Sequence, residues 1–230
     1  MLTLKDLQAN PEIAAMVHGA NEALNAIGYT DHGLRHVSYV SEHAGKLLES
    51  LGYDARTVEL ARMAGWVHDV GNIVNRVNHS LTGATLLFPI LRDLKMDTRE
   101  IGIIIGAVGE HEEQIGRPTH AVDSALIIAD KSDAHRSRVR KGAARRDIHD
   151  RVNYAISDNR LWVDVENRTI CYAVSMGETA SVMEYLSIFS KRMNLCGDAA
   201  RFLGCSYSLQ INALEVFRNA TASEISSGPR

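Results

Sequence analysis

Four histidines and two aspartates carry the strongest chemical signal in this chain: His36, the adjacent pair His68-Asp69, His79, His111 and Asp130. The pair lies among apolar residues, because Trp66 and Val67 precede it and Val70 follows it. This setting predicts that both polar side chains are buried, which is costly unless something binds them. A divalent metal ion is the usual compensation, since imidazole and carboxylate groups are its ligands. A hydrogen-bonded His–Asp pair without an ion is the alternative.

The remaining members of this set stand at places where a metal centre could gather them. His79 opens one expected helix, and His111 follows another. Asp130 ends an apolar run, where an unpaired carboxylate would be costly. His36 lies four residues after His32, so both are expected on one helix face. We therefore expect the six residues to converge on one ionic centre.

Apolar residues at helical spacing, separated by caps and breakers, predict helices through the first two-thirds of the chain. Asn10-Pro11 is typical of a cap followed by the first helical residue, and this helix should run to about Gly28. The next helix should carry His36 and end near Gly52. Further helices are expected over about 54–69, 79–94, 98–109 and 121–137.

Beyond residue 150 the pattern changes to alternation of apolar and polar residues, which is typical of half-buried strands. Strands are expected over 161–165, 170–174 and 206–213, with turns at Asp158-Asn159 and Glu166-Asn167 and a helix over about 179–203. The sequence thus predicts a mainly α protein. Its parts are a metal-binding helical domain over 1–150, a small α+β domain over 151–218 and a flexible tail over 219–230.

Composition limits the class of partner. The 230 residues carry a net charge of −3, which indicates no attraction to nucleic acids or membranes. The three cysteines are odd in number and lack metal-type spacing, so a reducing, cytoplasmic setting is expected. The longest apolar stretch, 101–108, is too short to span a bilayer.

Five segments resemble the HD superfamily of metal-dependent phosphohydrolases, which is named for its His-Asp doublet. They are 31–36 (DHGLRH), 66–72 (WVHDVGN), 78–84 (NHSLTGA), 110–113 (EHEE) and 128–136 (IADKSDAHR). The resemblance implies an HD-type helical bundle in which His36, His68, Asp69 and Asp130 hold one ion. His79 and His111 match the additional ligands of members that hold two ions.

The two-metal branch that hydrolyses cyclic dinucleotides is similar to this chain but not identical in its motifs. It has two consecutive histidines where this chain has Glu110-His111, and a Gly-Tyr-Pro signature where this chain has Gly116-Arg117-Pro118. His32 stands where that branch has a glutamate ligand. The resemblance leaves open whether His32 or Glu110 is a further ligand.

The activity implied by the resemblance is hydrolysis of a phosphomonoester or phosphodiester of a nucleotide or another small molecule. One or two ions of iron, manganese, zinc, cobalt or nickel would serve as cofactor. Asp69 and Lys131 are the expected catalytic residues. The expected substrate-binding residues are Lys131, Asp133, Arg136 and Arg138. The three cationic side chains suit phosphate, and Asp133 resembles a charged partner of Lys131 in the outer shell of the metal. A surface ion pair for Lys131 and a solvated helix face for the wider basic run remain alternatives.

Two other functions are compatible with the same residues. A di-iron oxygenase could use this ligand set, and a non-catalytic nucleotide sensor could retain the domain. Glu110, Glu112 and Glu113 could order water or a ligand histidine, or form a plain acidic loop. The α+β part could cover the site, bind an effector or form a homodimer.

Overall fold

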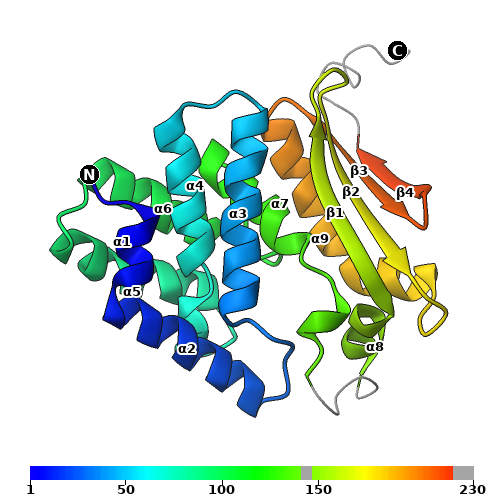
Figure 1. The fold of residues 1–230 in the computed structure, drawn as a ribbon, viewed down its shortest axis with the longest axis horizontal. Helices are drawn as coiled ribbons and strands as arrows, with labels where there is room; N and C mark the ends of the chain where they lie inside the picture. The colour runs from blue at the N-terminus through cyan, green and yellow to red at the C-terminus, as the bar shows by residue number, and fades with distance from the viewer. Residues whose placement is uncertain (141–146, 220–230) are drawn as a thin grey trace.

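The computed structural model describes residues 1–140 and 147–219, and it is mainly α with a small sheet near the C-terminus (Figure 1). Its helices are α1 (Leu4–Ala9), α2 (Pro11–Ala26), α3 (Leu34–Ser50), α4 (Ala55–Val67), η1 (Val70–Ile73), α5 (His79–Asp93), α6 (Thr98–Glu110), α7 (Ala121–Lys131), η2 (Arg136–Arg138), α8 (Ile148–Ala155) and α9 (Val182–Phe202). The strands are β1 (Ile156–Asp164), β2 (Thr169–Met176), β3 (Ser206–Ile211) and β4 (Leu214–Asn219). The basic residues Lys141, Arg145 and Arg146 and the tail beyond residue 219 lie outside the described residues.

Side-chain caps set the helix starts. The Asn10 side chain accepts from the backbone N–H groups of Glu12 and Ile13, and Pro11 occupies the first helical position. Asp54 caps α4 in the same way. The cap of α6 is Asp97, whose carboxylate accepts from the backbone N–H groups of Arg99 and Glu100.

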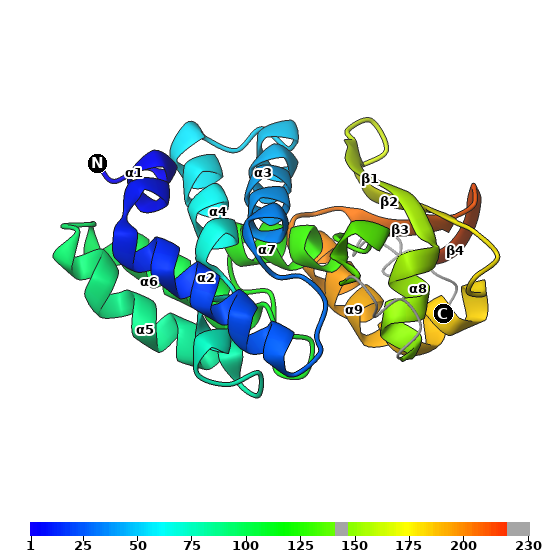
Figure 2. The same cartoon turned by 60° about the horizontal axis from the view of Figure 1, so that its bottom comes forward.

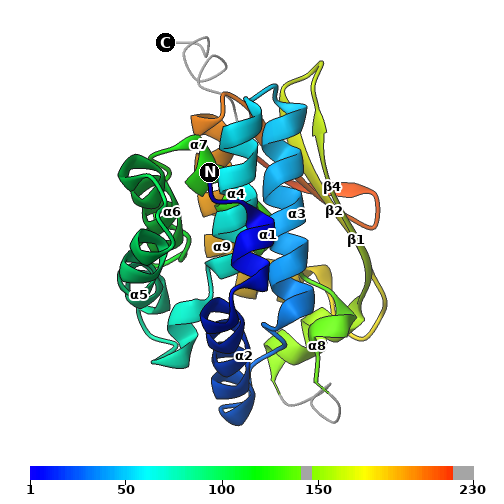
Figure 3. The ribbon, with the colours of Figure 1, turned by 60° about the vertical axis from the view of Figure 1, so that its left-hand side comes forward.

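The helices pack in layers around α7. Figure 3 shows α3 and α4 side by side in the middle, the α5–α6 pair on one side and the sheet on the other. Every residue of α7 from Ala121 to Ala129 is buried. A helix that is buried on all sides lies at the centre of a domain. Its last turn carries Asp130, so burial of this helix places that carboxylate deep among the other helices.

The four strands form one sheet in the order β1-β2-β3-β4. The β1–β2 and β3–β4 pairs are antiparallel, whereas β2 and β3 are parallel and are joined through α9. Figure 2 shows α8 and α9 beneath the sheet. Buried side chains from α7, α9, β2 and β3 belong to one apolar cluster. The predicted domain border at residue 150 falls within α8, and the sheet shares the core of the helices.

The structure corrects several expected boundaries. The helix expected over 121–137 ends at Lys131, because the Asn159 side chain donates to the carbonyls of Ser132 and Ala134 and fixes a non-helical segment there. Asp158-Asn159 is not a turn but part of β1, where Asn159 is paired with Val174.

Several short elements and one helix start also differ from expectation. The elements that were not expected are α1, η1, η2, α8 and β4, and short elements give weak periodic signals. His32 and His36 do not share a helix face, because α3 begins after Gly33 and His32 lies in the preceding loop.

Gly71 marks the closest backbone approach beside the metal-centre residues. A Cβ at this position would lie 1.9 Å from the His79 carbonyl oxygen and 2.5 Å from the Gly83 nitrogen. Both are backbone atoms of α5, so a side chain could be accommodated only by moving the helix that carries His79.

We predict that Gly71→Ala destabilises the protein by about 1–3 kcal/mol, because the added methyl group collides with backbone. Gly102→Ala is the matched control: Gly102 lies within α6 with no atom near its hypothetical Cβ, so this variant should stabilise by up to about 1 kcal/mol. Urea unfolding of both variants measures the difference. Equal stability of the two would contradict the close approach.

Candidate metal centre

The six residues of the candidate metal centre lie at the ends of six different helices. His36 lies in the first turn of α3 and His79 is the first residue of α5, whereas His68 and His111 directly follow α4 and α6. Asp69 precedes η1, and Asp130 lies in the last turn of α7. The four imidazoles and Asp69 are buried. The side chains converge, as expected from the sequence, and their role as ligands is taken up below as a proposal.

Hydrogen bonds at the outer nitrogens set the tautomers of these histidines. His68 Nδ1 lies 2.9 Å from the Gly65 carbonyl oxygen, and His111 Nδ1 lies 2.6 Å from that of Val108. His36 Nδ1 lies 2.7 Å from Asp133 Oδ2. Carbonyl and carboxylate oxygens only accept, so each Nδ1 must donate its proton. In the neutral imidazole, Nε2 then carries a lone pair.

The Nε2 atoms face one another across short gaps. His36 Nε2 lies 3.2 Å from His68 Nε2, and His79 Nε2 lies 3.0 Å from His111 Nε2. Two lone pairs at this distance repel unless a proton or a cation stands between them. The arrangement therefore suits a bound cation.

The Asp69 carboxylate joins the two histidine pairs. Its Oδ2 lies 3.5 Å from His36 Nε2 and 3.4 Å from His68 Nε2, whereas its Oδ1 lies 3.4 Å from His79 Nε2 and 4.0 Å from His111 Nε2. Among the described residues, Oδ2 is buried with no hydrogen-bond partner. An orphaned carboxylate oxygen is costly, and a metal ion would satisfy it.

The spacing of the first group fits one ion. Asp130 Oδ1 lies 3.3 Å from His36 Nε2 and 3.6 Å from His68 Nε2. Ligands that are each about 2.1 Å from an ion are themselves about 3.0–3.4 Å apart. The three distances among His36, His68 and Asp130 run from 3.2 to 3.6 Å, at or just beyond this spacing, and His68, Asp69 and His111 form a second compact group of possible ligands. The donor set therefore fits one or two divalent ions.

The charges of the carboxylates are maintained by their neighbours. Burial alone would raise the pKa of Asp130, but Lys131 and the imidazoles of His36 and His68 hold it well below its ordinary value. The pKa of Asp69 is likewise depressed despite burial, chiefly by His68 and His79. Burial and the neighbouring His68 and His79 lower the pKa of His111. The centre thus combines ionised carboxylates with a histidine that resists protonation.

A surrounding layer fixes these side chains. Asp133 accepts from both terminal nitrogens of Arg35, each at 2.7 Å, and from His36 Nδ1. Asn72 Nδ2 donates to Asp69 Oδ1 at 2.8 Å. Lys131 Nζ donates to Asp130 Oδ2 at 2.7 Å and lies 3.0 Å from Glu113 Oε2. Such supporting bonds orient ligands and tune their basicity.

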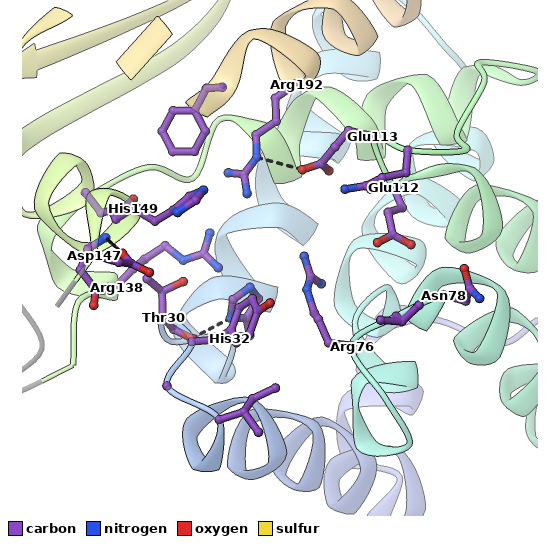
Figure 4. A pocket seen from close by; sticks show the side chains of 18 of the residues that line it. Thr30, His32, Arg76, Asn78, Glu112, Glu113, Arg138, Asp147, His149 and Arg192 are labelled. Atoms are coloured by element: carbon purple, nitrogen blue, oxygen red, sulfur yellow. Dashed lines mark hydrogen bonds and ion pairs between the residues drawn. The ribbon is translucent and has the colours of Figure 1, made fainter. Parts of the chain in front are cut away.

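A cavity of about 580 Å³ opens beside the centre (Figure 4). Arg76, Arg138 and Arg192 reach toward its middle from the loop before α5, from η2 and from α9, respectively. Arg76 also lies next to the centre, with Nη1 3.1 Å from His79 Nε2. The cavity can therefore receive an anionic molecule and present it to the metal-centre residues.

The expected substrate-binding residues occupy different places. Arg138 lines the cavity. Asp133 lies behind His36 with its side chain fully buried, so it positions the histidine instead of meeting a substrate. Arg136 donates to the Ile156 carbonyl and lies over the Tyr154 ring, outside the cavity lining. Lys131 is buried between Asp130 and Glu113 and is not a surface ion pair.

His32 and Glu110, whose role as further ligands the resemblance leaves open, lie in different places. His32 lines the cavity, with its Nδ1 2.7 Å from the Thr30 carbonyl and its ring centroid 5.3 Å from that of His36. Burial and the nearby Arg138 lower its pKa well below 6.5. Glu110 accepts from the Arg117 backbone N–H, on the chain segment that follows α6.

Sequence reasoning missed Arg35, Asn72, Arg76 and Arg192. Arg35 and Asn72 stand within the resembling segments, so their spacing could have suggested a supporting role. Arg76 stands three residues before His79. Arg192 carries no sequence signal, because it reaches the cavity only through the packing of α9.

Residues 33–144 match the HD domain family. The chain contains an HD domain. All six residues of the centre fall inside this range. The expected resemblance to the HD superfamily is thereby confirmed, whereas its two-metal cyclic-dinucleotide branch is not.

The chain is similar to one protein of known sequence and to one solved structure. The chain is 23% identical over 203 residues to an uncharacterized protein of Methanocaldococcus jannaschii, and the match covers 76% of each chain. It is also similar to the crystal structure of a predicted HD superfamily hydrolase from an uncultured Thermotogales bacterium, with a TM-score of 0.43 and 21% identity. That similarity covers 54% of this chain and 67% of the other. Within the described residues, no helix has the length and apolar character needed to cross a membrane.

We predict that Asp133→Asn weakens metal binding roughly 10- to 100-fold, because the His36 imidazole loses its charged acceptor. The matched control is Asp123→Asn, a buried aspartate of α7 whose partners are Thr119 and Ser124. Competition with a chelating dye measures affinity. Equal affinities of the two variants would remove the supporting role of Asp133.

Metal affinity is expected to fall with pH. Burial alone lowers the pKa of His68, but Asp69 and Asp130 reverse this and hold it above 6.5. The metal-free protein is therefore stabilised by protonated His68 at low pH and loses that contribution as pH rises through the raised pKa. A metal must displace this proton, so affinity should drop about tenfold per pH unit below that pKa. Affinity that stays constant between pH 8 and 6 would contradict this.

Proposed function

We propose that this protein is a metal-dependent phosphohydrolase that acts on a phosphomonoester or phosphodiester of a small molecule, such as a nucleotide. The observation that carries the proposal is the Asp69 carboxylate, whose two oxygens face different histidine pairs. This is the arrangement expected of a carboxylate shared between two ions. The HD domain over residues 33–144 supports the same class of hydrolase.

We assign the ligands as follows: His36, His68, Asp69 and Asp130 for one ion, and Asp69, His79 and His111 for a second. Iron, manganese, zinc, cobalt and nickel all suit histidine and carboxylate donors. Divalent ions in such a centre neutralise charge on phosphoryl oxygens and lower the pKa of bound water. Asp69 would act in catalysis because its carboxylate belongs to both ligand sets.

The surrounding residues orient the substrate and the ligands. Arg76 lies between the cavity and His79, so its guanidinium can bind the phosphate that faces the centre. Lys131 holds Asp130 and Glu113 in place from behind, and its expected catalytic role is therefore exercised through Asp130. The buried centre excludes bulk water, which strengthens each of these electrostatic contacts.

The cellular setting belongs to the same proposal. A small phosphorylated molecule is the proposed partner, and cytoplasm is the proposed location. A homodimer is compatible with this function. Nothing in the charge of −3 favours a nucleic acid or a membrane surface as substrate.

Elemental analysis followed by a phosphatase screen with several metals tests the function. We expect Asp69→Ala to lose bound metal and activity together, because both ion positions depend on its carboxylate. His18→Ala is the control: His18 is exposed and pairs with Glu22 on α2, and this variant should retain both. Full activity of Asp69→Ala, or iron-dependent oxygen consumption without phosphate release from any ester, would overturn the proposal.

The number of ions has its own test. His111→Ala is expected to lower the metal content from about two ions per chain to about one, because His111 belongs only to the second ligand set. The same elemental analysis gives the count, with His18→Ala again as the reference. An unchanged count would show that the second position holds no ion.

A further inference from the structure

The three arginines of the cavity differ in how they contact the metal-centre residues. Arg76 touches His79, whereas Arg192 is separated from Asp130 by the intervening side chains of Lys131 and Glu113. Figure 4 shows Arg192 descending from α9 and Arg138 approaching from the side of His149. The cavity therefore has cationic groups beyond those beside the centre.

Arg192 is held in one orientation by two contacts. Its Nε donates to Glu113 Oε1 at 3.3 Å, and its guanidinium carbon lies 4.5 Å from the centre of the Phe189 ring. Using Nε for Glu113 leaves the two terminal nitrogens directed into the cavity, as Figure 4 shows. A fixed guanidinium with two terminal donors is suited to bidentate binding of an anion.

The carboxylate that contacts Arg192 also contacts a second cation. Glu113 carries one negative charge but lies between two cations, Lys131 and Arg192. The other acidic groups of the lining are Glu112, Asp147 and Asp150. Glu112 faces His79, and Asp147 caps α8 by accepting from the Asp150 N–H. Glu112 and Asp147 thus have contacts with groups other than Arg192.

Arg138 adds a buried cation to the same wall. Its Nε donates to the Asp31 carbonyl at 3.0 Å, and its Nη1 donates to the Asp133 carbonyl at 2.9 Å. These bonds fix the guanidinium while its outer end lines the cavity. The Asp133 carboxylate, with Oδ2 3.7 Å from Arg138 Nε, compensates part of this buried charge, and an anion in the cavity would add to that compensation.

We propose that the substrate carries a second anionic group, a phosphate or a carboxylate, which Arg192 and Arg138 bind apart from the phosphate that is hydrolysed. This inference rests on the proposed phosphohydrolase function and names its substrate class. It assigns α9, from the C-terminal part of the chain, to substrate selection. A cavity of about 580 Å³ has room for a molecule with two such groups.

Matched substrate pairs test the second group. Adenosine 3′,5′-bisphosphate is compared with adenosine 5′-monophosphate for a phosphate, and 3-phosphoglycerate with glycerol 3-phosphate for a carboxylate. Wild type should prefer the doubly anionic member of at least one pair in kcat/KM. Arg192→Ala should reduce that preference roughly 10- to 100-fold. The loss should come from a higher KM of the doubly anionic substrate, because a pair of charge-assisted hydrogen bonds is removed. Lys191→Ala, an exposed neighbour on α9, should retain the preference.

The pair that shows the preference identifies the second group. No preference in wild type, or a preference that survives Arg192→Ala, would overturn the inference. Calorimetric binding of adenosine 3′,5′-bisphosphate and 3-phosphoglycerate to Asp69→Ala and to Asp69→Ala/Arg192→Ala separates the two proposals. A weaker affinity in the double variant supports the subsite even when wild type hydrolyses no ester, and equal affinities count against it.

Discussion

One electrostatic constraint governs the centre of this molecule: imidazole lone pairs face one another in a space closed to water. The Nε2 atoms of His36 and His68 are 3.2 Å apart, and those of His79 and His111 are 3.0 Å apart. The outer protons of the His36, His68 and His111 rings are committed to fixed acceptors, so these rings cannot simply turn their lone pairs away. A cation relieves the repulsion without rearrangement. The helices that meet here are thus arranged so that a cation fits between their ends.

The ends of the helices orient these imidazoles. The last carbonyls of a helix have no partner within it, and the Nδ1 protons of His68 and His111 satisfy carbonyls at the ends of α4 and α6. The same hydrogen bond that closes the helix therefore aims Nε2 inward. The C-terminal ends of α4, α6 and α7 also favour a cation through their dipoles. The N-terminal ends of α3 and α5 act in the opposite sense, and the carboxylates of Asp69 and Asp130 outweigh them.

The C-terminal sheet contributes to the same site through α9. The parallel pairing of β2 and β3 requires a crossing connection, and α9 provides it while packing against α7. Arg192 consequently reaches Glu113, which contacts Lys131 beside Asp130. A chain of alternating charges thus runs from the sheet side of the molecule to the metal-centre residues. Helix α9 therefore contributes both to the apolar core and to the polar site.

The amino-acid sequence by itself determined the helix pattern, the alternating strands and the six polar residues of the centre, because periodicity, caps and motif spacing are local properties. The start of α2 was predicted correctly from Asn10-Pro11. The predicted end of α7 lay beyond Lys131, because the Asn159 contact that ends this helix comes from a strand distant in the sequence. Only the tertiary structure decided that Asp133 turns to His36 and that Arg192 enters the cavity. Those positions depend on packing between segments far apart in the chain, and no local pattern encodes them.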